Sequence, residues 1–389
     1  MKRLFIEPLD VLMFRSERSF IARESHVAKL GIISPLTFEG AIKSKILLEF
    51  CKRKGYPPSK FQVRKKRSET KYEAESLEEL KKLAENDYEL KELLEIIGYS
   101  PLNYPSKLNV LGVFFAEKEI ELFPIPNDVM KEDKKDGNII KIKPTKLTEH
   151  LFIVLPLEYS KVKEIDGLIE FEELKNYLWG KIPKVKTIKH KNAKLNKPYL
   201  KEARAGIQIE RRMKTPVEGH LYTAEFLRIL EKWGFIVWYE SPKKIEEDLN
   251  GLLRLGGEGR GVVCSKIEDI DVSKKLNSLE LIKEINEEKK FKLYLATPSY
   301  FSDYKPPEDK LRCYLNVNNL ELVSALPGKP VYIGGYDFAM NKEKPLKRWV
   351  NAGAVYYYEF KGEVDPNLNL PIKIINGNID VRCAFIGRW

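Results

Sequence analysis

The chain has 389 residues, of which 43% are hydrophobic, and its 68 Lys and Arg exceed its 57 Asp and Glu by a formal net charge of +11. This length and apolar content allow two domains of ordinary size and exclude wholesale disorder. No apolar run approaches a membrane span, and the first ten residues lack the apolar region of a secretory signal. We therefore expect a cytoplasmic protein with no membrane partner.

The cysteines and histidines are scattered along the chain, with no CxxC or HExxH spacing. We therefore expect no metal site and no other cofactor. The cysteines are predicted to be small, reduced core residues. They are Cys51, Cys264, Cys313 and Cys383.

The excess of basic residues is concentrated in one tract. Residues 181–214 contain twelve Lys and Arg but only two acids, Glu202 and Glu210, which gives the tract a net charge of +10. A tract of this charge favours a polyanionic partner such as nucleic acid. The alternative is a solvated basic surface of the kind that heat-stable proteins carry.

Capping residues and apolar patterns predict the first elements. Residues 2–7 have the pattern of a buried strand. Ser34-Pro35 opens a helix that ends at Gly55, because Ser is a good N-cap, Pro suits the first helical position and Gly suits the position after the last turn. Gly40 lies within this helix, where glycine costs about 1 kcal/mol relative to alanine, which indicates close packing or the approach of a ligand.

The later elements follow the order strand, helix, hairpin, helix, strand roughly twice. They are an insertion at 56–107 with a helix over 76–97, a hairpin at 108–123, a strand at 151–155, a short helix at 171–179, an exposed basic arm at 181–201, strands at 206–209, 235–239 and 291–297, a helix at 271–289, and aromatic strands at 331–338 and 352–360. This order is typical of ferredoxin-like, or RRM-like, domains. We therefore expect an α+β fold with two such domains and insertions, divided near residue 200 into 1–200 and 201–389.

A glycine-rich loop lies in the stretch LLRLGGEGRGVVC, between two short apolar runs. Its backbone N–H groups could form an anion-binding concavity, and its two arginines suit a phosphate. The alternative is a glycine-bulged hairpin turn with solvated arginines. A P-loop and a Rossmann fingerprint are excluded, because Val262 and Val263 follow the last glycine and begin an apparent strand.

No catalytic constellation stands out in the sequence. His26 or His220 could act as the general base of a metal-independent RNA cleavage, with Tyr222 and Arg211 as helpers for His220. Nothing in the spacing requires this chemistry. RNA binding through Lys, Arg and stacked aromatic side chains therefore remains the first hypothesis.

Several segments resemble a known family when their order and spacing are taken together. They are EPLDVLMFRSERSF, ISPLTFEGAIKS, ARAGIQIERRMKTPVEGHLY, RLGGEGRG, LATPSY, GGYDF, RWVNAGAVYYYEF and the terminal IGRW. This set resembles the third subunit of the Cmr complex, the type III-B CRISPR RNA-silencing machine, within the RAMP superfamily. The resemblance implies a non-catalytic subunit that helps to hold the 5′ tag of crRNA. It also implies that the subunit contacts the large polymerase-like subunit and the neighbouring backbone and small Cmr subunits.

The resemblance also implies which residues contact RNA, because the superfamily has a helix motif and a glycine-rich loop. The expected RNA-binding residues are Arg15, Arg18, Lys43, Lys45, Arg204, Arg211, Arg212, Lys214, His220, Arg254, Gly256, Gly257, Gly259, Arg260 and Gly261. Some relatives in the superfamily process precursor crRNA with a histidine, so an endoribonuclease is the alternative function. A purely structural adaptor whose basic surface meets an acidic protein is a third.

Overall fold

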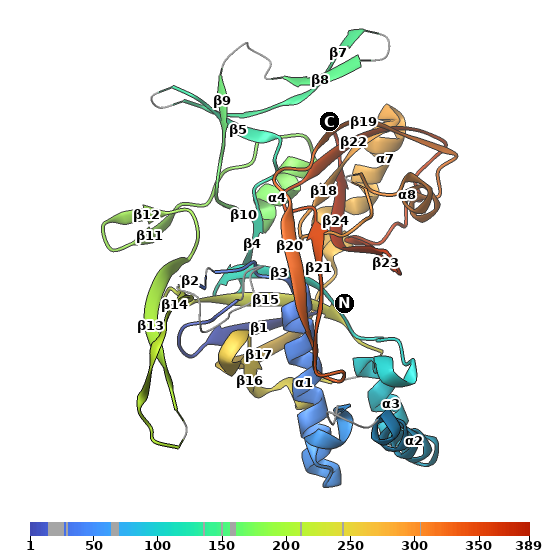
Figure 1. Ribbon diagram of the computed structural model, residues 1–389. Coiled ribbons are helices and arrows are strands. Elements are labelled where there is room, and N and C mark those ends of the chain that lie inside the picture. The colour runs from blue at the N-terminus through green and yellow to red at the C-terminus, as the bar shows by residue number, and fades with distance from the viewer. Residues whose placement is uncertain are drawn as a thin grey trace.

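Two antiparallel sheets organise the computed structural model (Figure 1). The structure describes residues 1–14, 27–28, 30–63, 70–134, 137–148, 151–155, 161–210, 212–242, 245–303 and 305–389. Within these residues the larger sheet has the strand order β10-β4-β3-β15-β1-β17-β16, formed by Leu168–Glu170, Ile120–Pro124, Asn109–Glu117, Trp233–Glu240, Lys2–Pro8, Arg260–Asp269 and Gly251–Leu255. The smaller sheet has the order β19-β22-β18-β24-β23, formed by Asn319–Leu326, Val355–Lys361, Lys290–Leu295, Ile379–Gly387 and Ile372–Asn376. The expected α+β class, with antiparallel sheets, is confirmed.

The larger sheet combines strands from distant parts of the sequence. β1 pairs with β15 on one side and with β17 on the other, so strands that follow residue 200 complete a sheet that begins at residue 2. Strands from before and after residue 200 therefore belong to the same sheet. Sheet membership changes between Asp269 and Lys290, where the helices α6 (Val272–Leu276) and α7 (Ser278–Glu288) lie. We call the parts before and after this change the N-terminal and C-terminal halves.

Helix α1 (Pro35–Lys54) begins and ends as the sequence predicts. The Ser34 hydroxyl accepts a hydrogen bond from the Leu36 N–H, and Gly55 closes the helix with a φ of 71°. α1 packs on the larger sheet, where the Phe38 and Phe235 rings lie 5.2 Å apart. Gly40 differs from the expectation of close packing, because nothing lies within 4 Å of the position that a Cβ would occupy.

Two of the predicted helices are each divided in two. In the insertion, α2 (Thr70–Asn86) and α3 (Tyr88–Ile97) meet at Asp87, whose carboxylate caps α3 by accepting from two backbone N–H groups. Later, α6 (Val272–Leu276) and α7 (Ser278–Glu288) meet at Asn277, which has a φ of 58°. The other helices are α4 (Phe171–Leu178), α5 (Glu246–Leu249) and α8 (Glu308–Leu315), with 3₁₀ turns at Pro58–Phe61, Ser100–Leu102 and Gly257–Gly259.

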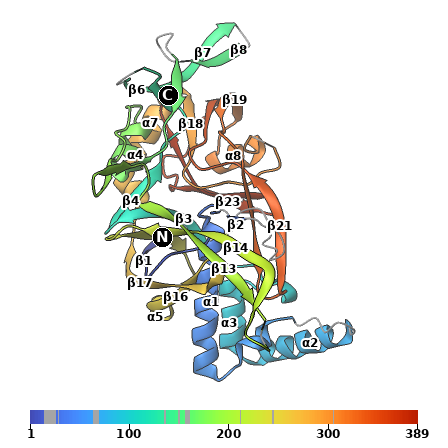
Figure 2. The same ribbon diagram turned by 60° about the vertical axis from the view of Figure 1, so that its left-hand side comes forward.

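Two long hairpins project from the sheets. β13 (Tyr199–Ile209) pairs with β14 (Pro216–Ile229), which also pairs in parallel with β2 (Val27–Ala28). β20 (Val331–Asp337) pairs with β21 (Lys342–Trp349), a strand that the sequence patterns missed. We call these the β13–β14 ribbon and the β20–β21 ribbon, and both extend toward the end of the molecule that carries α2 and α3 (Figure 2).

Short strands form the remaining sheets. They are β5 (Val129–Glu132), β6 (Ile139–Lys141), β7 (Lys143–Thr148), β8 (Leu151–Leu155), β9 (Val162–Glu164), β11 (Ile188–His190) and β12 (Ala193–Leu195). The last two form a small hairpin inside the tract 181–201, which was expected to be an exposed arm. Of the cysteines, Cys51, Cys264 and Cys383 are buried as predicted, whereas Cys313 is exposed.

A buried ion network links the two halves. The Arg382 guanidinium, on β24, donates to the Glu39 carboxylate of α1 and, at 2.9 Å, to the Val110 carbonyl of β3. The same carboxylate accepts from the Val110 N–H at 3.1 Å and from the Lys43 ammonium at 2.6 Å. Burial alone would raise the pKa of Glu39, but the positive charges of Arg382 and Lys43 hold it below its ordinary value.

Candidate nucleic-acid interface

The glycine-rich loop is the turn between β16 and β17, and the chain's own backbone packs closely against it. The Gly257 N–H donates to the Met13 carbonyl at 2.7 Å. Gly256 has a φ of 74°, and a Cβ there would lie 2.4 Å from the same carbonyl oxygen. The loop is thus a hairpin turn, and one N–H of the predicted anion concavity bonds within the chain. Packing against Met13 in a left-handed backbone conformation explains why position 256 needs glycine.

Replacing Gly256 by Ala is expected to lower the free energy of unfolding by about 2 kcal/mol, because the new Cβ meets the Met13 carbonyl in a backbone conformation that L residues rarely adopt. Gly251→Ala is the matched control, since Gly251 also has a positive φ, of 87°, but nothing lies within 4 Å of its Cβ position. We expect about 1 kcal/mol for the control. Equal losses in urea unfolding would show that the contact with Met13 does not determine the residue.

The loop contacts the base of the β13–β14 ribbon through Phe226, which is 3% exposed. The guanidinium carbon of Arg260, from the loop, lies 4.9 Å from the centroid of the Phe226 ring. The guanidinium carbon of Arg204, from β13, lies 5.2 Å from the same centroid. The structure therefore brings together two predicted residues that are 56 positions apart in the sequence. The aromatic residue between them was not predicted.

Carboxylates balance the charges of these arginines. Glu202 accepts from Arg204 at 2.7 Å and from Arg228 at 2.5 Å, and Asp10 lies 3.7 and 3.4 Å from the same two guanidiniums. The hydrogen bonds from Arg228 and Arg204 lower the pKa of Glu202 to about 2. Arg260 is paired with Glu258 at 2.6 Å. A phosphate at this cluster would have to compete with acidic side chains that the sequence analysis did not assign to the site.

The tip of the β13–β14 ribbon has a different character. Arg212 and Lys214 are exposed, and neither forms an ion pair within the described part of the chain. Lys214 has a φ of 55°, and its N–H closes the turn on the Glu210 carbonyl at 2.8 Å. Large apolar side chains are also exposed here, at fractions of 45, 56 and 73% for Ile207, Ile209 and Met213. The tip therefore presents cations and apolar side chains together.

Lys43 and Lys45, the predicted RNA contacts on helix α1, both pair with carboxylates of the same helix. Lys43 pairs with Glu39 in the network that joins the halves, and Lys45 pairs with Glu49 at 3.0 Å. Burial lowers the pKa of Lys43, against the opposing effect of Glu39. These ammonium groups are therefore less available to a phosphate than the sequence alone suggests.

The structure describes few contacts for the remaining predicted site residues. Gly259 ends the turn, and the exposed Arg254 of β16 pairs across the hairpin with Gly261 of β17. Arg15, Arg18, Arg211 and His26 lie outside the described residues. His220 lies in β14, but its side chain, like that of Tyr222, is outside the described part.

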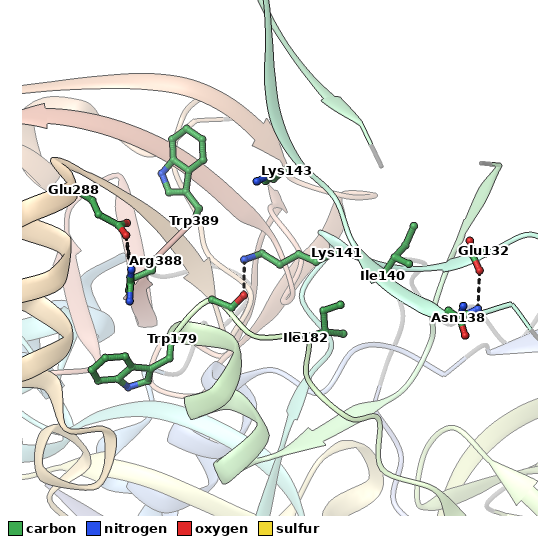
Figure 3. Close-up of a pocket in the computed structure, with 11 residues that line it drawn as sticks. Glu132, Asn138, Ile140, Lys141, Lys143, Trp179, Ile182, Glu288, Arg388 and Trp389 are labelled. Carbon is green, nitrogen blue, oxygen red and sulfur yellow. Dashed lines mark hydrogen bonds and ion pairs between the residues drawn. The ribbon is translucent and has the colours of Figure 1, made fainter. Parts of the chain in front are cut away.

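Figure 3 shows a cavity of about 620 Å³ on another part of the surface. Trp179, Trp389 and Lys141 line it, and the Arg388 guanidinium beside them pairs with Glu288 at 2.5 Å. None of the predicted site residues line this cavity. A second cavity, of about 640 Å³, lies between the halves and is lined by residues that include Phe115, Tyr199 and Thr297.

The described ranges contain neither a candidate metal site nor a candidate membrane-spanning helix. No group of three or more His, Cys, Asp or Glu side chains there is placed to hold a metal ion. No helix in the same ranges is long and apolar enough to cross a membrane.

The antiparallel sheets and the helices packed on them define the class of the protein, which is mixed α+β. The model of the family described as "CRISPR-associated protein (Cas_Cmr3)" matches residues 4–370, and the chain belongs to this family. The match confirms the resemblance to the third Cmr subunit that the sequence motifs indicated.

Solved structures that resemble the chain include subunits of two type III complexes. One chain is from "Cryo-EM structure of the Type III-B Cmr-beta bound to cognate target RNA and AMPPnP, state 1", with 18% identity over 91% of this chain and 86% of that chain and a TM-score of 0.44. Another is from the crystal structure of the Csm3-Csm4 subcomplex in the type III-A CRISPR-Cas interference complex, with 14% identity over 100% and 99% and a TM-score of 0.36. No curated protein matches the chain.

Proposed function

We propose that the chain is a non-catalytic RNA-binding subunit of a type III-B CRISPR (Cmr) effector complex. It anchors the 5′ tag of crRNA and bridges the large polymerase-like subunit to the backbone subunits in the cytoplasm. Membership of the Cas_Cmr3 family and the +11 net charge of the chain support this proposal. The proposal includes two ferredoxin-like units with insertions, expected at 1–200 and 201–389.

The observation that carries the proposal is the tip of the β13–β14 ribbon. Arg212 and Lys214 are exposed without an ion pair in the described structure, as a phosphate contact requires. Ile207 and Met213 beside them can pack against unstacked bases, which a single-stranded tag offers and a duplex does not. The combination fits a single strand better than it fits a solvated basic surface.

The glycine-rich loop and the arginines beside it extend this interface toward the base of the ribbon. The proposed contacts there are Arg204, Arg254, Gly256, Gly257, Gly259, Arg260 and Gly261. Lys43 and Lys45 of α1 are further proposed contacts. Arg15, Arg18, Arg211 and His220 are proposed from the sequence alone. Contacts at Arg204 and Arg260 require the RNA to displace Glu202 and Glu258 from their ion pairs.

The test is charge reversal at the tip, Arg212→Glu with Lys214→Glu. We expect weaker binding of a labelled crRNA tag and a slope of log K against log salt that is smaller by about 1.4, because two phosphate contacts are lost from a single strand. The control is Lys283→Glu with Lys361→Glu, two exposed lysines that change the net charge equally. An affinity and a slope equal to those of the control variant would remove the tip from the interface.

The same experiment decides between binding and cleavage. RNA incubated with the protein in EDTA should remain intact on a denaturing gel. Discrete products that disappear in His220→Ala or His26→Ala would replace the proposal with a metal-independent endoribonuclease. If the tip variant binds RNA as wild type does and still assembles with the large subunit, the result would favour the third alternative, a structural adaptor whose basic surface meets an acidic protein.

A further inference from the structure

The cavity of about 620 Å³ has no role in the proposed function (Figure 3). It is bounded by the segment that carries β6 and β7, by the residues that follow α4 and by those that follow β24. Its volume lies in the range of ligand-binding sites. None of the residues assigned to the RNA interface line it, so a ligand here would be recognised by a different set of side chains.

Two lysines on one wall of the cavity have no carboxylate partner. Lys141 and Lys143 both line it, and neither forms an ion pair within the described residues. Ile142 between them is buried, so the two lysines leave the chain on the same side, with Cα atoms about 7 Å apart. Burial lowers the pKa of Lys292 behind this wall, and the charge of Lys141 lowers it further. The wall therefore carries positive charge that an incoming anion would offset.

The acids in the lining are already paired with cations of the chain. Glu288 pairs with Arg388 at 2.5 Å, and the same guanidinium lies 3.0 Å from Glu284. Glu132 pairs with Lys134 at 2.9 Å. These carboxylates are committed, so the lysines of the opposite wall are left for an external partner.

The rest of the lining is apolar and aromatic. Ile182 is 49% exposed, and Ile140 also lines the cavity (Figure 3). Trp179 and Trp389 pack against the apolar core of the C-terminal half. The Lys290 ammonium lies 4.8 Å from the centroid of the Trp389 ring and occupies the ring face that a stacked base would need. The lining therefore suits an aliphatic side chain better than a nucleobase.

We propose that this cavity binds an extended acidic segment of a partner protein. Two carboxylates at alternate positions of the segment pair with Lys141 and Lys143, because alternate side chains of an extended chain lie on one side with the same spacing of about 7 Å. An apolar side chain of the segment packs against Ile140 and Ile182. RNA has no aliphatic group for that wall, so the lining favours a protein. The inference rests on the proposed membership of a complex and adds the chemistry by which one neighbour is recognised.

The test uses the Cmr complex assembled from the full chain and the other subunits. A carbodiimide joins an ammonium group to a carboxylate in direct contact, so we expect cross-links from Lys141 or Lys143 to an Asp or Glu of another subunit. Lys141→Glu with Lys143→Glu should raise the Kd for that subunit on the order of tenfold, because attraction becomes repulsion. Lys141→Arg with Lys143→Arg keeps both charges and should retain the association. Lys81→Glu with Lys82→Glu, two exposed lysines of α2, is the charge-matched control.

The outcomes separate this inference from the proposed function. Association equal to that of the control, with no cross-link at either lysine, would overturn the inference and leave the test of the β13–β14 ribbon unaffected. Lost RNA binding with retained subunit association would also overturn it and make the cavity a nucleic-acid contact. Unchanged RNA binding in the variant at Arg212 and Lys214, with cross-links at the cavity, would retain the inference and remove the ribbon tip. Thermal unfolding checks each variant, and Lys141→Gln with Lys143→Gln replaces the charge reversal if that variant does not fold.

Discussion

Replacing Glu39 by Gln is expected to lower the free energy of unfolding by about 3 kcal/mol at neutral pH, because it removes one partner of a buried ion pair. Glu39 is 9% exposed and Arg382 only 4%, so the guanidinium would lose charge compensation where water cannot replace it. Asp380 still pairs with Arg382 at 2.7 Å, which places the loss at the lower end of the range for buried pairs. Urea unfolding at pH 7 measures the change.

The dependence on pH identifies the carboxylate as the cause. Its pKa in the folded protein lies below the ordinary value of 4.5, so its contribution is fully present above pH 4.5 and is lost as the pH falls through the lowered pKa. The difference between wild type and Glu39→Gln should therefore shrink in acid. Glu49→Gln is the control on the same helix, because Glu49 pairs with the exposed Lys52 and should change stability by less than about 1 kcal/mol. A pH-independent difference would contradict the role of the charge.

Asp128→Ala is expected to cost more, about 4 kcal/mol, because three buried groups lose a partner. Asp128 has no exposed surface and accepts from the hydroxyls of Tyr177 and Tyr357, each at 2.8 Å. Lys292, also without exposed surface, donates to the Tyr177 carbonyl at 2.8 Å, and its ammonium lies 3.3 Å from the centroid of that ring. Burial lowers the pKa of Lys292 well below its ordinary value, against the opposing effect of Asp128.

A double-mutant cycle tests this assignment. Lys292→Met in the Asp128→Ala background should recover more than 1 kcal/mol, because it removes the cation that the carboxylate compensated. Tyr357→Phe is the matched control, since it keeps the ring and removes only the hydroxyl that lies between the Asp128 carboxylate and the Ile142 carbonyl, at a cost of about 1 kcal/mol. Additive effects of the two main changes would show that Asp128 and Lys292 are not coupled.

The Glu39 and Asp128 clusters hold together the elements from which the two ribbons project. The Glu39–Arg382 network joins α1 to β24, and Asp128 joins the segment after β4 to α4 and β22. Because both lie in the interior, changes to exposed residues at the tip of the β13–β14 ribbon should alter RNA binding without altering the fold. That separation is what makes the charge-reversal variants interpretable.

The sequence predicted some features through local physics. Ser34, Pro35 and Gly55 specify the ends of α1, because a cap and a left-handed closing residue act over a few positions. The motifs that indicated the family are confirmed by the match over residues 4–370. The predicted helices at 76–97 and 271–289 are interrupted at Asp87 and Asn277, and the first of them begins at Thr70 instead of residue 76.

The sequence by itself determined the composition class, the capped helix, the +10 charge of residues 181–214 and the family. Tertiary structure alone decided that β15 and β17 flank β1, that Phe226 lies between Arg204 and Arg260, and that Glu202 pairs with Arg204, an expected RNA contact. It also decided that Tyr332 is exposed whereas Tyr356 to Tyr358 are buried. The physical reason is range: capping and charge density act between sequence neighbours, whereas strand pairing, ion pairing and burial depend on residues brought together from distant parts of the chain.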